Sequence, residues 1–286
     1  MTPATRRAVV GGICADHEGV SERRVCEVLC WSRTSVRYKA VASPTEEARE
    51  KLASLARERP SWGYRRLFVV LRKQCARIGR RRFLALYAAL GLARKRNPRR
   101  RPTPRRDAAQ LPRANAPRES YACDFMHHTT TSAVTFRLLV VVDEFTREIL
   151  ALRVAKSFTT RTTTQALGDV FAEYGTPQQL RCDNGSEFIS SGTRTWLAGH
   201  KVKTLYSRPA KPCDNGLCES TNGRIRDELL SPNLFASIDA AEEAAAAYRI
   251  DYNENRPHSS LKNLTPNEFY AKYHSAEAIM QGGQEM

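Results

Sequence analysis

Three carboxylates are the residues of this chain best suited to chemistry on a phosphodiester. Asp124 lies in an apolar stretch, Asp183 opens the segment DNGSEF, and Glu219 follows Asp183 with 35 residues between them. Phosphodiester chemistry with a divalent metal needs two or three carboxylates that converge on one point, because Mg²⁺ takes oxygen ligands and keeps several waters. Each of these acids alone could equally be a surface turn residue, so the prediction depends on their meeting.

The segments around these acids predict that they meet at one end of a sheet. Residues 121–128, 135–145 and 147–155 have the pattern of strands, and the second is apolar enough to be buried on both faces. A helix over about 160–174, a short strand at 178–182, another helix, a strand at 201–207 and a helix from Leu217 follow. This order predicts an α/β fold with a mixed sheet. Asp143 and Glu144 are better explained as turn residues between the second and third strands.

The helix from Leu217 places further residues by its periodicity. At about 100° per residue, Arg226 falls on nearly the face of Glu219, and Glu228 falls on the opposite face. Arg226 is therefore expected to reach DNA phosphate, and Glu228 is not expected to replace Glu219 as a ligand. Asn222 and Gly223 lie one turn along, where the backbone can approach DNA.

The charge of the chain is concentrated in its first part. Of the net charge of +16, residues 1–118 carry 29 basic against 9 acidic residues, and residues 119–286 carry 17 against 21. In the run 94–106, eight of thirteen residues are Arg or Lys. Such density favours a polyanion, and nucleic acid is the commonest one. A solubilising basic face and a targeting or ribosome-type tail are the alternatives.

Two groups of helices are expected in this basic part. Residues 21–38 predict a short helical pair in helix-turn-helix outline, with Ser21 as N-cap. Residues 46–90 predict three more helices, and Gly91 is placed to end the last. Their aromatic residues are expected to lie in the core, and the basic residues opposite them are expected to contact phosphate. Residues 97–118, with five prolines, predict an extended linker.

The cysteine pattern favours a reducing compartment. The eight cysteines form no CxxC pair, so free thiols are expected. A zinc site of His17, Cys26 and Cys30 is the alternative, although its spacing does not suit a tetrahedral site.

No apolar run approaches the roughly 18–20 residues that span a bilayer, and the basic N-terminus has no apolar signal region. A cytoplasmic protein without membrane contact is expected.

The motifs DF at 124–125, DNGSEF at 183–188, KPCDNGLCESTNGRIRDEL at 211–229 and YNENRPHSSLKNLTPNEFY at 252–270 resemble the integrase core of insertion-sequence transposases. The resemblance is to the second-frame (orfB-type) product of the insertion-sequence-three family. It covers about residues 10–273, and RERPSWGYRRL and GRRRFLALYAALGL resemble the helical segment before that core. It implies a ribonuclease H-like fold, similar to retroviral integrase, in which Asp124, Asp183 and Glu219 form a DDE triad.

The resemblance also implies cofactors and further site residues. Two Mg²⁺ ions, or Mn²⁺, would be bound by the triad, and Asn184, Gly185 and Asn215 would shape the loops around them. DNA contacts are expected from Arg226 and from Arg65, Arg66, Arg80, Arg81, Arg82, Arg99, Arg100 and Arg101. The sequence departs from the family at Tyr121, Cys182 and Thr221, where Trp, Ser and an aromatic residue are common. None of these departures removes a ligand, but Thr221 changes the packing beneath the catalytic helix.

The predicted function is that of a DNA transposase, a polynucleotidyl transferase that cuts at insertion-sequence ends and joins the 3′-hydroxyl to target DNA. A DNA-binding regulator with an inactive core and a ribonuclease H-like nuclease are the alternatives. The partners expected are double-stranded DNA, further copies of the chain, and an upstream-frame protein or fusion, in the bacterial cytoplasm at the nucleoid. The expected divisions are a helix-turn-helix-like segment at 1–45, a helical DNA-binding domain at 46–96, a linker at 97–118, the catalytic core at 119–275 and a tail at 276–286.

Overall fold

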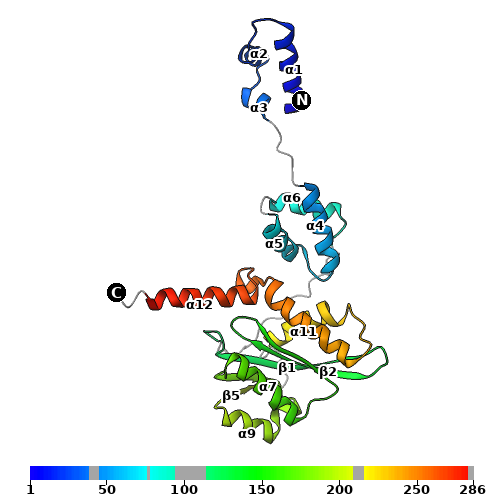
Figure 1. Ribbon diagram of the computed structural model, residues 1–286, viewed down its shortest axis with the longest axis vertical. Helices are drawn as coiled ribbons and strands as arrows, with labels where there is room; N and C mark the ends of the chain where they lie inside the picture. Colours follow the sequence, from blue (N-terminus) through cyan, green and yellow to red (C-terminus); the bar gives the residue numbers. More distant parts are fainter. Residues whose placement is uncertain (39–44, 76–77, 94–113, 209–215, 283–286) are drawn as a thin grey trace.

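The computed structural model describes residues 1–38, 45–75, 78–93, 114–208 and 216–282. Along the chain it consists of three helices, then three more helices, then a sheet with helices on both faces (Figure 1). None of the helices in these described ranges is long and apolar enough to cross a membrane.

The first group contains a helix that was not predicted. Its members are α1 (Pro3–Asp16), α2 (Glu22–Val28) and α3 (Arg33–Arg37). The helical pair expected at 21–38 is confirmed, and Ser21 caps α2 through the amide of Arg24. α1 supplies Val10 to the small core that Val25 and Val36 complete. It was missed because its apolar residues follow no clean helical period, although Thr2 and Pro3 are an N-cap and a first-turn proline.

The second group has the three helices that the periodicity predicts, α4 (Thr45–Glu58), α5 (Tyr64–Gln74) and α6 (Arg80–Ala89). We call this group the helical unit. Leu52, Leu67, Leu71 and Phe83 are fully buried between its helices. Gly91 follows α6 with φ +66°, a conformation that favours glycine, so its role in ending the helix is confirmed.

The sheet has five strands in the order β3-β2-β1-β4-β5. β2 pairs antiparallel with β1 and β3, whereas β4 pairs parallel with β1 and β5. The mixed sheet expected from the sequence is therefore confirmed. The strands are β1 (Ser120–Thr129), β2 (Thr135–Asp143), β3 (Ile149–Ala155), β4 (Gln179–Cys182) and β5 (Lys203–Tyr206).

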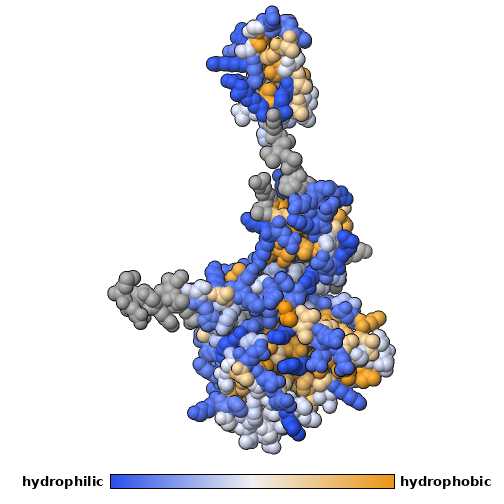
Figure 2. All heavy atoms as spheres, in the orientation of Figure 1, coloured by the Kyte–Doolittle hydropathy of each residue, from blue (hydrophilic) through white to orange (hydrophobic). Residues whose placement is uncertain are grey.

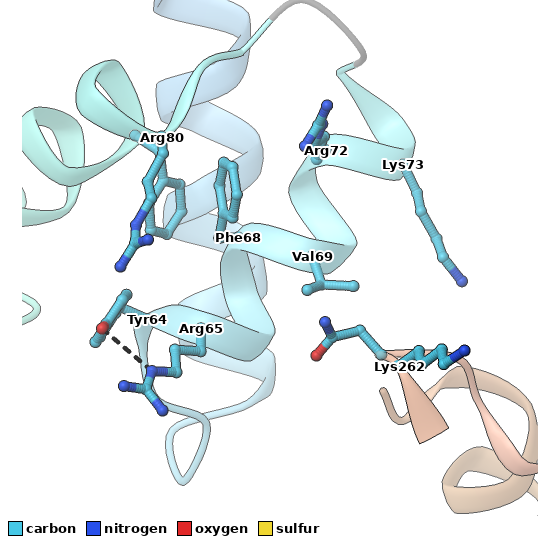
Figure 3. Close-up of a pocket in the computed structure, with 10 residues that line it drawn as sticks. Tyr64, Arg65, Phe68, Val69, Arg72, Lys73, Arg80 and Lys262 are labelled. Carbon is cyan, nitrogen blue, oxygen red and sulfur yellow. Dashed lines mark hydrogen bonds between the residues drawn. The ribbon is translucent and has the colours of Figure 1, made fainter. Parts of the chain in front are cut away.

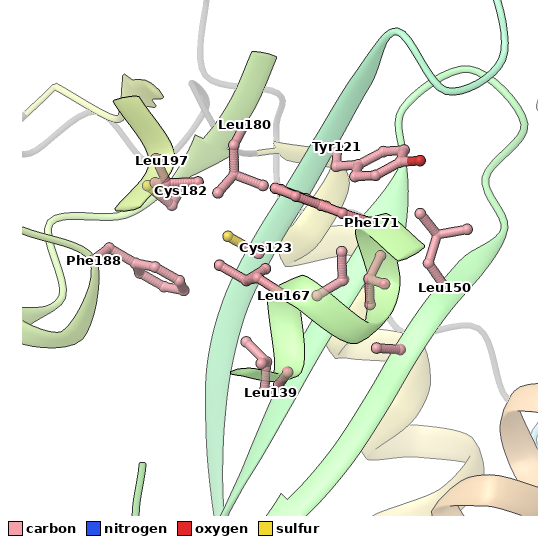
Figure 4. Close-up of a cluster of buried hydrophobic side chains, with 14 of the residues drawn as sticks. Tyr121, Cys123, Leu139, Leu150, Leu167, Phe171, Leu180, Cys182, Phe188 and Leu197 are labelled. Carbon is pink, nitrogen blue, oxygen red and sulfur yellow. The ribbon is translucent and has the colours of Figure 1, made fainter. Parts of the chain in front are cut away.

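Both faces of the sheet are covered by helices. In β2, Leu139 and Val141 point into one cluster, while Leu138, Val140 and Val142 point into the other. This alternation follows from the two-residue period of a strand, and it explains why β2 is apolar throughout. The helices that close the first cluster are α7 (Thr160–Tyr174), α8 (Ser186–Ile189) and α9 (Ser191–Gly199), and Figure 4 shows part of this cluster. The helices that close the second cluster are α10 (Gly216–Ile225), the π-helix η2 (Arg226–Leu230) and α11 (Ile238–Asn255).

The C-terminal segment packs against the core and contains two helices that were not predicted. Tyr252, Pro257 and Leu261 are buried. They belong to α11 and to the turn around η3 (Ser259–Leu261), after which α12 (Pro266–Gly282) begins. α11 was missed because its buried face is partly made of Ala241 and Ala245, which give a weak apolar signal.

Three ion pairs join the helical unit to the part of the chain that contains the sheet. Arg59 pairs with Asp251 of α11, and Lys73 pairs with Glu268 of α12. Arg66 approaches Glu228 of η2 at 3.4 Å. The helical unit thus contacts the sheet domain on the side where α11 lies (Figure 1).

Candidate active site

The register of two parallel strands brings Asp124 and Asp183 to one end of the sheet. The parallel pairing of β1 with β4 ends at Ala122 and Arg181. Asp124 lies two residues beyond this pair, and Asp183 directly follows the last residue of β4. The carboxyl ends of parallel strands are a common position for catalytic side chains in open α/β sheets.

The aromatic residues of the two motifs pack against each other beside these acids. The rings of Phe125 and Phe188 stack with their centroids 5.0 Å apart. The Arg137 guanidinium lies 4.4 Å from the centroid of Phe125 and pairs with Glu187. DF and DNGSEF, 58 residues apart between Phe125 and Asp183, are therefore held together by their phenylalanines.

The loop after β4 is a tight turn built on Asp183. Asp183 Oδ1 accepts a hydrogen bond of 3.0 Å from the amide of Gly185. A Cβ at position 185 would lie 2.9 Å from that oxygen, closer than real Cβ contacts, so glycine is required to leave the carboxylate in place. Asn184 Nδ2 donates to the Ser207 carbonyl at 2.8 Å and ties this loop to the end of β5. Asn215 lies outside the described residues.

A contact that the sequence did not predict links the third acid's helix to the first acid. Asn222 Nδ2 donates a hydrogen bond of 2.7 Å to Asp124 Oδ2. Asn222 lies three residues after Glu219, so both are on one face of α10. That spacing was the available signal, but the sequence alone assigned Asn222 only to backbone approach. Glu219 itself is exposed.

The environment of Asp124 raises the pKa of its carboxyl to about 6. Burial is the largest cause, and the Asp183 and Glu219 carboxylates add to it. Hydrogen bonds from the Phe125 amide and from Asn222 act in the opposite direction. Three carboxylates that repel one another's charge are an arrangement that a divalent cation stabilises.

The donor set suits Mg²⁺, although its geometry is not preformed. Two aspartates and one glutamate supply the oxygen ligands that Mg²⁺ prefers. Within the described ranges, no three Asp, Glu, His or Cys side chains are close enough to hold a metal as they stand. One oxygen of Asp124 is bonded to Asn222 instead. The residues fit a divalent cation by charge and chemistry, and the side chains must rearrange to bind it.

Each of the three acids follows a buried cysteine. Cys123, Cys182 and Cys218 are fully buried below Asp124, Asp183 and Glu219, and Figure 4 shows the first two inside the apolar cluster. Burial raises the pKa of the Cys123 thiol well above its usual value. The cysteine at position 182, where the family often has serine, thus points into the core and leaves the acid free to face outward. None of the seven cysteines in the described ranges forms a disulfide.

Thr221, one of the departures from the family pattern, lies on the buried face of α10. Its side chain is fully buried, and its hydroxyl has no hydrogen-bond partner among the described residues. The Oδ1 atom of Asn222 is also buried without a partner there. An unpaired buried polar group costs stability.

The helix geometry assumed for Arg226 and Glu228 ends at Ile225, where α10 changes into the π-helix η2. Arg226 is exposed. Glu228, expected on the face opposite Glu219, has a side chain that is only 8% exposed and accepts two hydrogen bonds from Arg256. The wider turn of a π-helix and the partners on α11 decide this placement.

The arginines expected to bind DNA differ in their surroundings. Arg65, Arg80, Arg81 and Arg82 are exposed on the helical unit, and hydrophilic residues cover much of that unit in Figure 2. Arg66 is half-buried and paired with Glu228. Arg99, Arg100 and Arg101 lie outside the described residues. DNA contact by any of them stays a prediction.

His258 is buried in the turn before η3. Burial lowers its pKa, and the nearby Arg256 and Arg224 charges lower it further, to about 2. Its ring contacts Tyr252 with centroids 4.9 Å apart. A neutral histidine packed on a tyrosine is a structural residue.

Known proteins resemble this chain over most of its length. The family described as Integrase core domain matches residues 114–212, and a second family of the same description matches residues 200–266. The insertion element IS407 uncharacterized 31.7 kDa protein of Burkholderia multivorans is 33% identical over 268 residues, which are 93% of this chain and 96% of that protein. The transposase for insertion sequence element IS904 of Lactococcus lactis is 29% identical over 58% of this chain and 66% of its own length.

A solved structure shares the fold. In the simian T-cell lymphotropic virus intasome in complex with PP2A regulatory subunit B56 gamma, one chain superimposes with a TM-score of 0.51. That match has 20% sequence identity and covers 77% of this chain and 74% of the viral chain. The ribonuclease H-like fold expected from the sequence is thereby confirmed.

Proposed function

This chain belongs to the insertion-element transposases with an integrase core domain, and from that premise we propose that Asp124, Asp183 and Glu219 are its catalytic carboxylates. The enzyme is a DDE-type polynucleotidyl transferase that acts in DNA transposition. The observation that supports the assignment is the position of the acids: Asp124 and Asp183 lie at one end of the sheet, and Asn222, on the helix that carries Glu219, donates a hydrogen bond to Asp124.

The three carboxylates would hold the divalent cations that this chemistry requires. Two Mg²⁺ or Mn²⁺ ions would activate the attacking water or 3′-hydroxyl and stabilise the leaving oxygen. The protein's part is to fix the acids: the Phe125–Phe188 stack holds two of them, and the turn at Gly185 aims Asp183. Asn222 orients Asp124 by its hydrogen bond.

The reaction is a direct displacement at phosphorus, first at the element end and then on target DNA. In the first step a water oxygen attacks, and the 3′-oxygen of the element end leaves. In the second step that 3′-hydroxyl attacks a target phosphodiester, and a target 3′-oxygen leaves. The numbers of phosphodiester bonds formed and broken in the second step are equal, so no covalent intermediate with the protein is needed.

DNA would run from the active site onto the basic residues around it. Arg226 lies exposed one turn beyond the Asn222 position and would contact phosphate next to the reacting strand. Arg65, Arg80, Arg81 and Arg82 would bind phosphates on the helical unit, and Arg99, Arg100 and Arg101 on the linker at 97–118. Arg66 would either stabilise the fold through its ion pair with Glu228 or contact DNA, and mutation separates these two roles.

The assembly would contain at least two copies of the chain, because two element ends must be brought to one target. We also propose that an upstream-frame protein, or a fusion with it, takes part in the assembly. The proposed domain boundaries lie after residues 45, 96, 118 and 275, and the proposed location is the bacterial nucleoid. Size-exclusion chromatography with light scattering on the full chain, with and without paired element ends, tests the oligomer.

A strand-transfer assay with labelled element ends and Mg²⁺ tests the function. Wild type should give joined product, and Asp183→Asn should give none while binding DNA normally. A ribonuclease H-like nuclease would cut without joining, and a regulator with an inactive core would bind without cutting. Absence of joined product from wild type, with binding intact, would refute the transposase assignment for this chain acting alone.

A further inference from the structure

An open cleft lies between the helical unit and the turn after η3. Its volume is about 660 Å³, and its lining comes from α5, from Arg80 and Phe83 of α6, and from Lys262 and Asn263 (Figure 3). The two sides belong to segments almost 200 residues apart in sequence. The proposed function uses Arg65 and Arg80 of this lining for phosphate contact, and it assigns no role to the aromatic residues or to Lys262.

The cleft is strongly basic. Five cations line it, and no carboxylate does: Arg65, Arg72, Lys73, Arg80 and Lys262. Lys73 pairs with Glu268 at the rim, and Arg65 donates to the Tyr64 hydroxyl at 3.2 Å. Among the described carboxylates, none forms an ion pair with Arg72, Arg80 or Lys262. Cations gathered without acids bind a polyanion.

Aromatic rings form the apolar part of the cleft. Tyr64 and Phe68 are half-buried, so part of each ring faces the cavity while the rest packs into the unit. Phe68 is supported from behind by Phe83, with ring centroids 5.1 Å apart. In Figure 3 the Phe68 ring stands between Arg80 and Arg72. Rings flanked by cations are the arrangement on which unpaired bases stack.

The turn that carries Lys262 is held in an unusual conformation. Lys262 has φ +57° and Asn263 has φ +66°, and a lysine is disfavoured in this left-handed region. The turn is fixed by the His258 carbonyl, which accepts from the Leu261 and Asn263 amides at 3.0 and 2.8 Å. Both Lys262 and Asn263 are exposed. Backbone strain maintained at an exposed basic tip is typical of a binding loop.

We propose that this cleft binds an unpaired nucleotide of a DNA strand. The base lies against Phe68 and Tyr64, and the flanking phosphates contact Arg72, Arg80 and Lys262. A cavity of this volume is of the size of small-ligand pockets, about 300–1,000 Å³, and holds one or two nucleotides rather than a duplex. The inference rests on the proposed function, because the strand is taken to be that of an element end opened for cleavage.

Two DNA probes and the full-length chain test the inference. One probe is a blunt duplex with the element end, and the other is the same duplex with three unpaired 3′ nucleotides, the middle one 2-aminopurine. Lys262→Ala and Arg72→Ala should each weaken binding of the overhang probe about tenfold and of the blunt probe less than twofold. The matched controls, Lys272→Ala and Arg57→Ala, remove exposed cations outside the cleft and should leave both affinities unchanged.

The base contact has its own readout. Wild type should change the emission of 2-aminopurine on binding, because stacking on an aromatic ring alters its fluorescence, and Phe68→Leu should abolish that change. Circular dichroism of Phe68→Leu checks its fold, and Lys262→Ala, on an exposed turn, needs no repacking. Equal losses for both probes would overturn the nucleotide pocket in favour of plain phosphate contact, and so would no loss with either probe.

The test of the active site is independent of the test of the cleft. Asp183→Asn should bind the overhang probe as wild type does and join no DNA. If wild type joins DNA but Lys262→Ala binds normally, the cleft inference fails and the function stands. If the cleft variants lose overhang binding and wild type joins nothing, the function fails and the cleft stands.

Discussion

Asn222 Nδ2 donates a 2.7 Å hydrogen bond to Asp124 Oδ2, and this bond connects α10 to the centre of the sheet. The two residues are 98 positions apart. The bond brings the helix that carries Glu219 next to β1, and it lowers the pKa of Asp124 against the effect of burial. Its loss should therefore change both the position of α10 and the charge of the site.

Asp124→Asn should stabilise the metal-free protein while abolishing strand transfer. Because the folded pKa of about 6 lies above the ordinary 3.8, the ionised carboxyl costs stability, and wild type should lose stability as pH rises from about 4 to 6. Asparagine removes this loss, which we expect to be about 1–2 kcal/mol at pH 7 after allowing for solvent screening.

Urea unfolding in EDTA and in Mg²⁺ measures this prediction. Mg²⁺ should stabilise wild type and leave Asp124→Asn unchanged, because binding to the folded state alone raises stability. If Asp124→Asn were as sensitive to Mg²⁺ as wild type, Asp124 would not be a metal ligand.

Gly185→Ala should reduce strand transfer at least tenfold without unfolding the protein. The backbone at Gly185, with φ −60° and ψ 145°, accepts alanine, but the new Cβ would lie 2.9 Å from Asp183 Oδ1 and displace it. A small misplacement of a catalytic group costs large factors in rate, about 10²-fold for 1 Å. Gly199→Ala is the control, because nothing lies within 4 Å of its added Cβ, and its rate should match wild type.

Glu228→Gln should destabilise the chain by about 3–5 kcal/mol, since it leaves buried Arg256 without its counter-charge. Although burial acts to raise it, the Arg256 hydrogen bonds and the Arg256 and Arg66 charges lower the pKa of Glu228 overall. Its contribution is therefore complete above the ordinary pKa of 4.5 and is lost as pH falls through the lowered folded value.

Thermal and urea unfolding between pH 3 and pH 7 compare Glu228→Gln with Asp169→Asn. Asp169 pairs with Arg153 on the surface, where both side chains are more than half exposed, so its loss should cost less than about 1 kcal/mol. Equal effects of the two variants would contradict a structural role of the Glu228 network.

Thr221→Val should raise the free energy of unfolding by about 1 kcal/mol, because valine has nearly the same shape and removes a buried hydroxyl without a partner. Thr193→Val is the matched control. Thr193 is equally buried, but its hydroxyl donates to the Glu187 carbonyl at 2.7 Å, so valine there should destabilise. Urea unfolding of both variants measures the difference, and the same sign for both would refute the argument.

The sequence by itself determined the order of the five strands and singled out the three acids as candidates. Strand β2 is an example, because its residues are apolar on both faces and this pattern predicts a strand that is buried on both faces. The DNG turn likewise follows from local chemistry, since aspartate, asparagine and glycine favour turns wherever they occur. The spacing of Asp183 and Glu219 came from the family resemblance and needed no contact information.

The tertiary structure alone decided which side chains meet. Asn222 contacts Asp124, and Arg66 contacts Glu228, although each pair is far apart in sequence. Lys262 likewise lines the same cleft as Arg72. Glu228 shows the physical reason. Its local periodicity places it on one helix face, but the π-helix and the buried Arg256 partner fix it in the interior. Helical period is a local property, whereas the energy of a buried ion pair depends on elements that only folding brings together.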